Sequence, residues 1–209
     1  MKRISILLIQ LGILPYCVLL NALLKNTYSP FESYILGLLG YWLCLVVTVF
    51  LLVKKDRELI SKVLALIANS KKSSISVLAF IPVILVFIVA IIPSIEQLTI
   101  RVVICSTILG IYNGLIEELF WRGITIIKSD GSLLFVVCST VLFGIYHFAY
   151  LVLSLTYQGG ALALVGGALV MGIIWLTVSL KTKSITASII AHQIVNIMAF
   201  SSLFILNNI

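Results

Sequence analysis

The sequence predicts an all-α fold, a polytopic membrane bundle of about seven transmembrane helices within a range of six to eight. Of the 209 residues, 62% are hydrophobic and only 10% are charged, and a water-soluble domain of this length could not bury so much apolar surface. The hydrophobic residues gather in stretches close to the ~20 residues that cross a bilayer as a helix. Lysine and arginine lie mainly in the connections between these stretches. We therefore expect a multi-pass integral protein of the cell membrane.

Breaks at charged residues, proline and glycine divide the chain into seven candidate spans. The fourth is longer than a bilayer requires, so we expect it to tilt, bend or extend beyond the membrane. Pro30 and Pro93 fall in the connections before the second and fourth spans, where a proline interrupts no helix. In order, the predicted spans cover residues 4–24, 33–53, 74–92, 98–127, 133–153, 161–180 and 185–205.

The basic residues predict the orientation. With the N-terminus in the cytoplasm, twelve of the 14 lysines and arginines fall on the cytoplasmic side, and only Lys25 and Arg101 fall on the outer side. The positive-inside rule therefore predicts a cytoplasmic N-terminus and an outer C-terminus. It also accounts for the net charge of +7, so no nucleic-acid partner is expected. The twelve residues are Lys2, Arg3, Lys54, Lys55, Arg57, Lys62, Lys71, Lys72, Arg122, Lys128, Lys181 and Lys183.

We expect one membrane domain over residues 1–209, because no linker or change in composition divides the chain. Residues 1–97 would supply accessory spans, and about 98–200 the core that carries the chemistry. Residues 54–75 form an amphipathic stretch predicted to lie on the cytoplasmic face of the lipid bilayer, where basic residues meet anionic headgroups. Anchoring of the topology is its favoured role, and substrate docking is the alternative. Four cysteines in apolar stretches, without metal-binding spacing, are predicted to be reduced: Cys17, Cys44, Cys105 and Cys138.

Small residues mark the sixth span and the connection before it. Such a face allows two membrane helices to approach closely, and helix packing is therefore its favoured role. The alternative is gating of a substrate. The residues are Gly159, Gly160, Ala163, Gly166 and Gly167.

Titratable residues inside the apolar spans predict a functional site. A charged side chain at the bilayer centre costs roughly 2.5–3.5 kcal/mol on insertion scales, so it usually has a function. The fourth span holds Glu117 and Glu118, and the two histidines of the chain, His147 and His192, lie in the fifth and seventh. Glu118 and Arg122 are four residues apart and can pair on one helix face. Glu117 is then a carboxylate without a local partner, able to accept a proton from water and pass it on.

These side chains are predicted to lie at similar depths. Counted from the inner helix ends, Glu117 lies roughly 15 Å deep, His147 roughly 21 Å, His192 roughly 10 Å and Asn196 roughly 16 Å, a slab about 10 Å thick. His192 and Asn196 share a helix face and could both donate to one oxygen, as an oxyanion site requires. Phe143 and His147 share a face in the fifth span. The alternative is a polar cluster that only holds the bundle together.

At these residues the sequence resembles the CPBP family, the CAAX proteases and bacteriocin-processing enzymes also called the Abi family. This family includes the type II CAAX prenyl proteases. Its pattern is EExxxR, then FxxxH, then HxxxN or HxxxD. All three motifs are present in that order, within residues 98–200: Glu117-Glu118…Arg122, Phe143…His147 and His192…Asn196. The resemblance implies a helical intramembrane endopeptidase.

The resemblance also implies roles for these residues. Glu117 would be the general base that activates a water, and His147 would help to bind and polarise that water. His192 and Asn196 would stabilise the oxyanion of the tetrahedral intermediate. Three further residues would support or orient the site: Glu118, Arg122 and Phe143.

A zinc ion is the alternative to a metal-free mechanism. Two histidines and a glutamate can hold zinc with an open position for water, and the set here would be Glu117, His147 and His192. However, the chain has no HExxH motif, and the three residues come from three different helices. A glutamate and a histidine can activate water without a metal, so we favour a site without a cofactor.

The leading hypothesis is an intramembrane endopeptidase that opens toward the cytoplasm. Its partner would be a membrane-associated peptide or protein substrate, such as a CAAX-type tail, a peptide pheromone or a bacteriocin precursor. A non-proteolytic immunity or regulatory scaffold of the same family is the alternative. A proton-coupled transporter is less favoured, because the sequence shows no inverted repeat.

Overall fold

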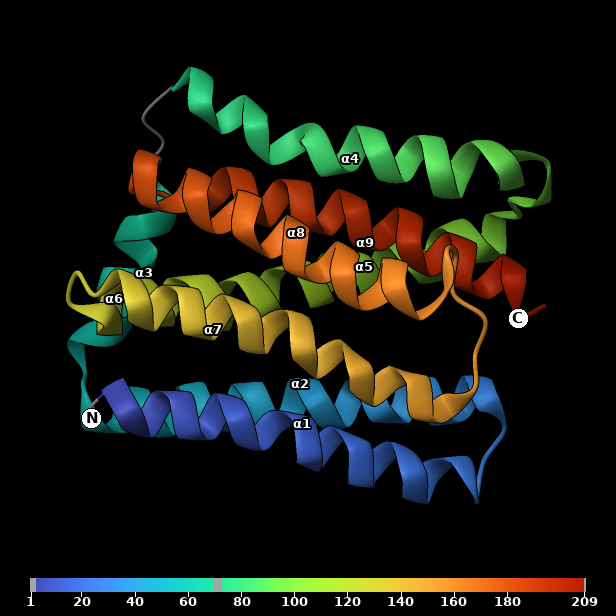
Figure 1. Ribbon diagram of the computed structural model, residues 1–209, viewed down its shortest axis with the longest axis horizontal. Helices are drawn as coiled ribbons and strands as arrows, with labels where there is room; N and C mark the ends of the chain where they lie inside the picture. The colour runs from blue at the N-terminus through green and yellow to red at the C-terminus, as the bar shows by residue number, and fades with distance from the viewer. Residues whose placement is uncertain (1–2, 70–72, 209) are drawn as a thin grey trace.

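The computed structural model describes residues 3–69 and 73–208, which form helices joined by short connections (Figure 1). Within these residues, seven helices are long and apolar enough to cross a membrane. The predicted all-α architecture and the number of spans are therefore confirmed. The spans cover Arg3–Lys25, Pro30–Lys55, Ser74–Gln97, Ile100–Ser129, Leu133–Leu153, Gly160–Thr182 and Thr186–Leu206.

Four of the spans are single α-helices, and the other three change helix type along their length. The single helices are α1 (Arg3–Lys25), α2 (Pro30–Lys55), α8 (Gly160–Thr182) and α9 (Thr186–Leu206). The third span comprises η1 (Ser74–Phe80), α4 (Ile81–Val86), the π-helical η2 (Phe87–Ile91) and η3 (Ile92–Gln97). The fourth comprises α5 (Ile100–Glu118), the π-helical η4 (Leu119–Ile124) and α6 (Thr125–Ser129). The fifth comprises α7 (Leu133–Tyr146) and the 3-10 segment η5 (His147–Leu153).

Pro93 lies inside the third span, whereas the sequence suggested a position just after it. It stands in the first turn of η3, directly after the π-helical segment η2, so the proline coincides with a change of helix type. The span therefore passes through the proline and ends at Gln97.

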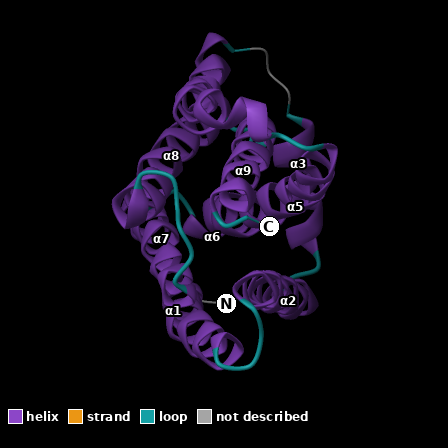
Figure 2. Ribbon diagram, turned by 90° about the vertical axis from the view of Figure 1, so that its right-hand side faces the viewer, coloured by secondary structure: helices purple, strands orange, loops and turns teal. Residues whose placement is uncertain are grey.

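Seen end-on, the helices form one bundle (Figure 2). Helices α8, α7 and α1 form a row along one side, α9 and α5 lie beside that row, and α2 lies beside α1 (Figure 2). The N-terminus, α3 and α6 lie at one end of the bundle, and the C-terminus lies at the other (Figure 1).

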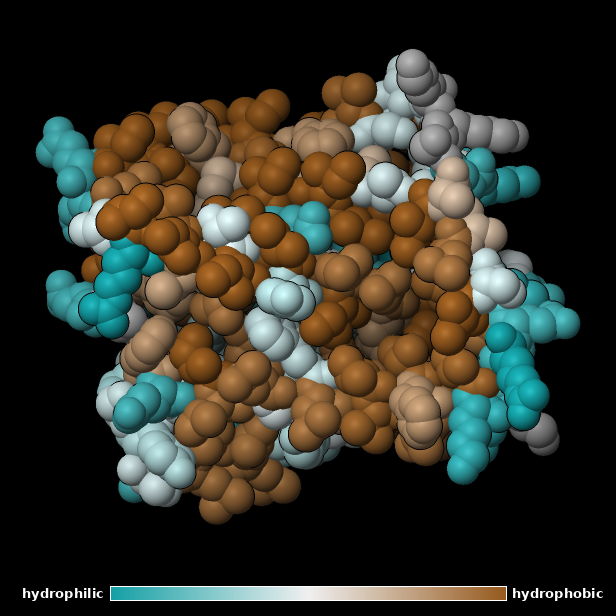
Figure 3. Space-filling model, turned by 180° about the vertical axis from the view of Figure 1, so that it is seen from behind, coloured by the Kyte–Doolittle hydropathy of each residue, from teal (hydrophilic) through white to brown (hydrophobic). Residues whose placement is uncertain are grey.

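A hydrophobic belt separates two polar ends of the molecule (Figure 3). Many large apolar side chains along the spans are exposed, among them Leu162, Ile100 and Leu134 at 83%, 75% and 73%, and so large an apolar surface indicates contact with lipid. The belt fits an integral membrane protein, whereas the predicted orientation stays a prediction. Three of the basic residues on which that prediction rests, Lys2, Lys71 and Lys72, lie outside the described residues.

The predicted amphipathic stretch contains the short helix α3 (Glu58–Ala68). Side chains tie this stretch to the bundle: Thr186 Oγ1, at the start of α9, donates to the carbonyl oxygen of Ile67 at 2.6 Å. Just before α3, Asp56 accepts a hydrogen bond from Lys128 of α6. This hydrogen bond holds the pKa of the Asp56 carboxyl below its usual value. The stretch is therefore packed against the membrane helices.

Helices α5 and α9 approach each other closely at two glycines of α5. A Cβ on Gly110 would lie 2.6 Å from the backbone nitrogen of Ile197, and one on Gly114 would lie 2.8 Å from that of Gln193. Glycine allows this separation because it has no side chain to hold the backbones apart. This contact brings the helix that carries the acidic pair against the helix that carries His192.

The glycines of α8 differ from this pattern. A Cβ on Gly166 would meet only Leu162 of the same helix, at 3.7 Å, and one on Gly167 would meet only Met171, at 3.9 Å. The favoured expectation of close helix packing at these positions was therefore wrong. Close packing of α8 occurs instead at Gly172, whose added Cβ would lie 3.1 Å from side chains of two other spans.

Substituting Gly114 by alanine should destabilise the bundle, because the added methyl group would push α9 away from α5. Overpacking of this kind typically costs about 1–3 kcal/mol. Thermal unfolding in detergent should show a lower Tm for Gly114→Ala than for the wild type. Gly12→Ala is the control, since a Cβ on Gly12 meets nothing within 4 Å. Equal Tm values for the two variants would contradict the importance of this contact.

Candidate active site

Two adjacent glutamates end α5. Glu117 and Glu118 are both 0% exposed, and the π-helical segment η4 follows them directly. Such π-helical turns are frequent at functional sites. Neighbouring residues on a helix point about 100° apart, so the two carboxylates face different partners.

Glu118 pairs with Arg122, as the sequence predicts. Arg122 Nη1 lies 3.0 Å from Glu118 Oε1, and both side chains are buried. The guanidinium carbon lies 4.1 Å from the ring centre of Phe143 and 5.7 Å from that of Trp175, so aromatic rings flank the cation. Gly172 makes room for this arrangement, because a Cβ there would lie 3.1 Å from Arg122 Nη2. One of the two buried carboxylates therefore has a fixed counter-charge.

His192 lies between the two carboxylates. Its Nδ1 is 2.9 Å from Glu118 Oε1, and its Nε2 is 3.2 Å from Glu117 Oε2. The imidazole also stacks on Trp175, with the ring centres 4.3 Å apart. The sequence suggested that His192 and Asn196 act together on one substrate oxygen. In the structure both ring nitrogens of His192 instead face protein carboxylates, because the α5–α9 contact brings the imidazole against the acidic pair.

Glu117 has a second partner that sequence reasoning missed. The Tyr146 hydroxyl donates to Glu117 Oε1, and the Tyr146 ring stacks on Tyr41 with the ring centres 4.6 Å apart. Tyr41 in turn accepts a hydrogen bond of 2.8 Å from Trp121 Nε1. As expected, Glu117 has no partner nearby in the sequence. In the folded structure, however, Tyr146 and His192 both contact it. The sequence signal that could have identified this partner was Tyr146 itself, a polar residue directly before His147 in an apolar span.

His147 begins η5, where the fifth span changes from α-helix to a 3-10 segment. Its Nδ1 lies 2.9 Å from the carbonyl oxygen of Phe143. A carbonyl can only accept, so Nδ1 carries the proton and Nε2 keeps a lone pair in the neutral ring. Asn21 of α1 stabilises this segment, since its Nδ2 donates to the carbonyl oxygen of Ala149 at 2.8 Å. His147 thus offers a proton acceptor at Nε2.

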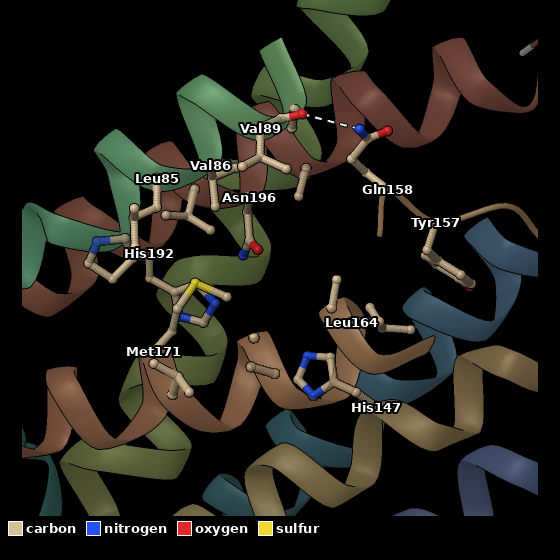
Figure 4. Close-up of a pocket in the computed structure, with 18 of the residues that line it drawn as sticks. Leu85, Val86, Val89, His147, Tyr157, Gln158, Leu164, Met171, His192 and Asn196 are labelled. Atoms are coloured by element: carbon tan, nitrogen blue, oxygen red, sulfur yellow. Dashed lines mark hydrogen bonds between the residues drawn. The ribbon is translucent and has the colours of Figure 1, made fainter. Parts of the chain in front are cut away.

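A cavity of about 340 Å³ lies among α4, η2, α8 and α9. His147, His192 and Asn196 line it and turn toward the same space, from η5 and α9 (Figure 4). Asn196 Nδ2 is buried and has no hydrogen-bond partner among the described residues, so it is an unsatisfied donor on a residue that lines the cavity. Glu117 does not line the cavity, but its Oε2 lies 3.2 Å from Nε2 of His192, which does.

The cavity runs from these residues toward Tyr157 and Gln158, in the connection before α8. On α8 the lining ends at Trp175, and on α9 it begins at His192. The cavity thus extends toward the end of the bundle opposite the N-terminus (Figure 1). This course differs from the cytoplasmic opening that we expected with a cytoplasmic N-terminus.

The side chains do not fit the three-ligand zinc site considered from the sequence. Among the described residues, no group of three His, Cys, Asp or Glu side chains is placed to hold a metal ion. Both ring nitrogens of His192 face carboxylates, and His147 Nδ1 faces a backbone carbonyl. What the site does bring together is a carboxylate, an imidazole acceptor and an amide donor, the groups needed for acid–base chemistry on a carbonyl compound.

Arg122→Met should strongly destabilise the protein, because it leaves buried carboxylates without their guanidinium partner. Breaking one side of a buried ion pair costs about 3–5 kcal/mol, so the Tm and the yield of monodisperse protein in detergent should fall. The double variant Arg122→Met/Glu118→Gln should recover part of the loss. Arg101→Met, at an exposed position, is the control. Wild-type stability of Arg122→Met alone would contradict a supporting role for the pair.

One comparison with known proteins identifies a family for this chain. A family model described as type II CAAX prenyl endopeptidase Rce1-like matches residues 76–198, which is more than half of the 209-residue chain. The matched region includes both carboxylates, Arg122, both histidines and Asn196. No curated protein and no solved structure matches the chain. The chain belongs to the Rce1-like type II CAAX prenyl endopeptidase family, a family of proteases.

Proposed function

We propose that this protein is an intramembrane endopeptidase that hydrolyses a peptide bond with a water activated by Glu117. The observation that carries the proposal is the environment of this carboxylate. Glu117 is fully buried, and Tyr146 holds its Oε1. Its Oε2 lies 3.2 Å from His192 and accepts no hydrogen bond from the described residues. Such a carboxylate is fixed in position and keeps a lone pair for a proton of water.

In the proposed reaction, the oxygen of the water forms a bond to the carbonyl carbon of the substrate, and one proton of the water moves to Glu117. His147 orients the water by accepting a hydrogen bond at Nε2. The carbonyl oxygen becomes negatively charged, and Asn196 Nδ2 donates a hydrogen bond to it. When the carbon–nitrogen bond breaks, Glu117 gives its proton to the leaving amine.

In this scheme His192 has a different role from the one that the family resemblance implied. Because it lies between Glu117 and Glu118, it orients the catalytic carboxylate and connects it to the Glu118–Arg122 pair. Asn196 then remains as the side chain of α9 that donates to the oxyanion. Glu118 and Arg122 act through His192 and do not touch the substrate.

Two features support a membrane-associated substrate with an apolar part. The family description names a CAAX prenyl endopeptidase, and the walls of the cavity beside His192 and Asn196 are mainly apolar. CAAX-type, pheromone-like and bacteriocin-like peptides have this character. We propose that the substrate belongs to this class.

Glu117→Gln should lower the rate of peptide hydrolysis by roughly 10²–10⁴-fold, the contribution typical of a general base. The measurement is cleavage of a farnesylated CAAX peptide by the purified protein, together with the membrane-peptide products of cells that carry the wild type or the variant. Glu96→Gln, at an exposed carboxylate, is the control for loss of one charge. Full processing by Glu117→Gln would instead support the non-proteolytic immunity or regulatory scaffold.

Tyr146→Phe should lower kcat and leave KM nearly unchanged, because Tyr146 holds Glu117 but does not line the cavity. A hydrogen bond to a charged group is worth about 1.5–3 kcal/mol, which corresponds to a fall in kcat of roughly 10–100-fold. Tyr34→Phe is the matched control, since Tyr34 of α2 is also buried but, unlike Tyr146, makes no hydrogen bond to Glu117 in the described part of the chain. A parallel fall in both variants would show that only packing of the tyrosines matters.

A further inference from the structure

Trp175 of α8 is a fully buried tryptophan beside His192. It is 0% exposed, and the proposed reaction gives it no role. Its ring lies face to face with the imidazole of His192, with the ring centres 4.3 Å apart and the planes inclined by 28°. A side chain in this place can determine how the imidazole is oriented.

The His192 imidazole needs a fixed orientation if it is to contact both carboxylates. Its Nδ1 lies 2.9 Å from Glu118 and its Nε2 lies 3.2 Å from Glu117, so rotation of the ring would disturb both contacts at once. The χ2 torsion of a histidine has broad energy minima and does not hold the ring by itself. A stacked aromatic face opposes the rotation, because the imidazole can turn about χ2 only by losing the stacked contact.

The backbone of Trp175 is fixed to the helix that carries His192. Ser188 Oγ of α9 donates to the carbonyl oxygen of Trp175 at 3.2 Å, and Ser179 Oγ of α8 lies 3.0 Å from Ser188 Oγ. Ser188 precedes His192 by four residues and therefore shares its helix face. The tryptophan and the histidine thus extend from backbones that are held together one helical turn away.

The indole is held from the third span. Trp175 Nε1 donates to the carbonyl oxygen of Ala79 at 3.0 Å, and both residues are buried. At the end of η1 the N–H of Ile81 donates to the carbonyl of Leu78, and the next bond of this 3-10 series would run from residue 82 to Ala79. Pro82 has no N–H, so the indole supplies a donor where the 3-10 series has none.

We infer that Trp175 is a positioning residue for the proposed reaction: its indole holds the His192 imidazole in the orientation that faces Glu117, and Ala79 holds the indole. This inference rests on the proposed function, because it assigns the tryptophan to the histidine that orients the catalytic carboxylate. Trp175 acts through His192 and does not touch the reacting atoms. The site thereby extends to a backbone carbonyl of the third span.

The first test measures kcat for cleavage of a farnesylated CAAX peptide at saturating concentration. Trp175→Leu removes the ring, and misplacement of the group that orients the general base should lower kcat roughly 10–100-fold. Trp175→Phe keeps an aromatic face without the indole N–H and should lower kcat less. Leu176→Ala is the control for lost packing on α8, since Leu176 is buried, does not line the cavity and belongs to a different hydrophobic cluster from Trp175. Its kcat should stay close to that of the wild type.

The second test reads the position of the imidazole without catalysis. The chain has only two histidines, so NMR of protein with isotopically labelled histidine gives one ring signal from each, and His147→Gln identifies the signal of His192. A proton beside the face of an indole is shifted upfield. This shift should disappear from the His192 signal in Trp175→Leu and persist in Leu176→Ala. Trp175→Phe, the milder change, should move the same signal by less and serves if Trp175→Leu does not fold.

The two measurements separate failure of this inference from failure of the proposed function. A displaced His192 signal in Trp175→Leu, in a protein that cleaves no peptide, would uphold the contact that orients His192 and reject the endopeptidase. An unchanged His192 signal in both Trp175 variants, the same displacement in Leu176→Ala, or a wild-type kcat despite a displaced signal would overturn the inference.

Discussion

The close contact of α5 with the backbone of α9, at Gly110 and Gly114, is the constraint on which the site depends. It brings the imidazole of His192 to 2.9 Å from Glu118 and 3.2 Å from Glu117. Hydrogen bonds weaken steeply when their geometry is lost, so even a small separation of these helices would remove His192 from both carboxylates. The two glycines are two and one turns before the acidic pair on the same helix, and packing there directly determines the chemistry.

Burial of two adjacent carboxylates requires compensation, because a buried charge without partners is very costly. Glu118 has two partners at Oε1, Arg122 and Nδ1 of His192, whereas its Oε2 has no hydrogen-bond partner among the described residues. Glu117 receives the Tyr146 hydroxyl on one oxygen, while its other oxygen has only the longer contact with His192. Of the two carboxylates, Glu118 has the guanidinium partner, and this counter-charge suits it to the supporting role that we propose. The aromatic rings around Arg122 keep the supporting pair dry and therefore strong.

Hydropathy and local spacing predicted the number of spans, the motif residues and the Glu118–Arg122 pair, since each of these depends on a single helix. The partners of Glu117 and His192 could not be predicted in the same way, because they depend on which helices are neighbours. The glycines of α8 illustrate this difference. A small-residue face looks the same in the sequence whether it meets a helix or a cavity, and Gly167 meets a cavity. Tyr146 was visible as a polar residue beside His147, but its target was not.

Residues 1–97 were expected to be accessory to the core, yet side chains of α1 and α2 contact the residues that surround the site. Asn21 binds the carbonyl oxygen of Ala149 just after His147, and Tyr41 stacks on the tyrosine that holds Glu117. Trp42 Nε1 also donates to Asn113 Oδ1 at 2.7 Å, one turn before Glu117. The match to the family begins only at residue 76, so these contacts come from the part of the chain without family motifs. A motif therefore identifies candidate reacting groups, whereas their exact placement depends on helices that lie outside it.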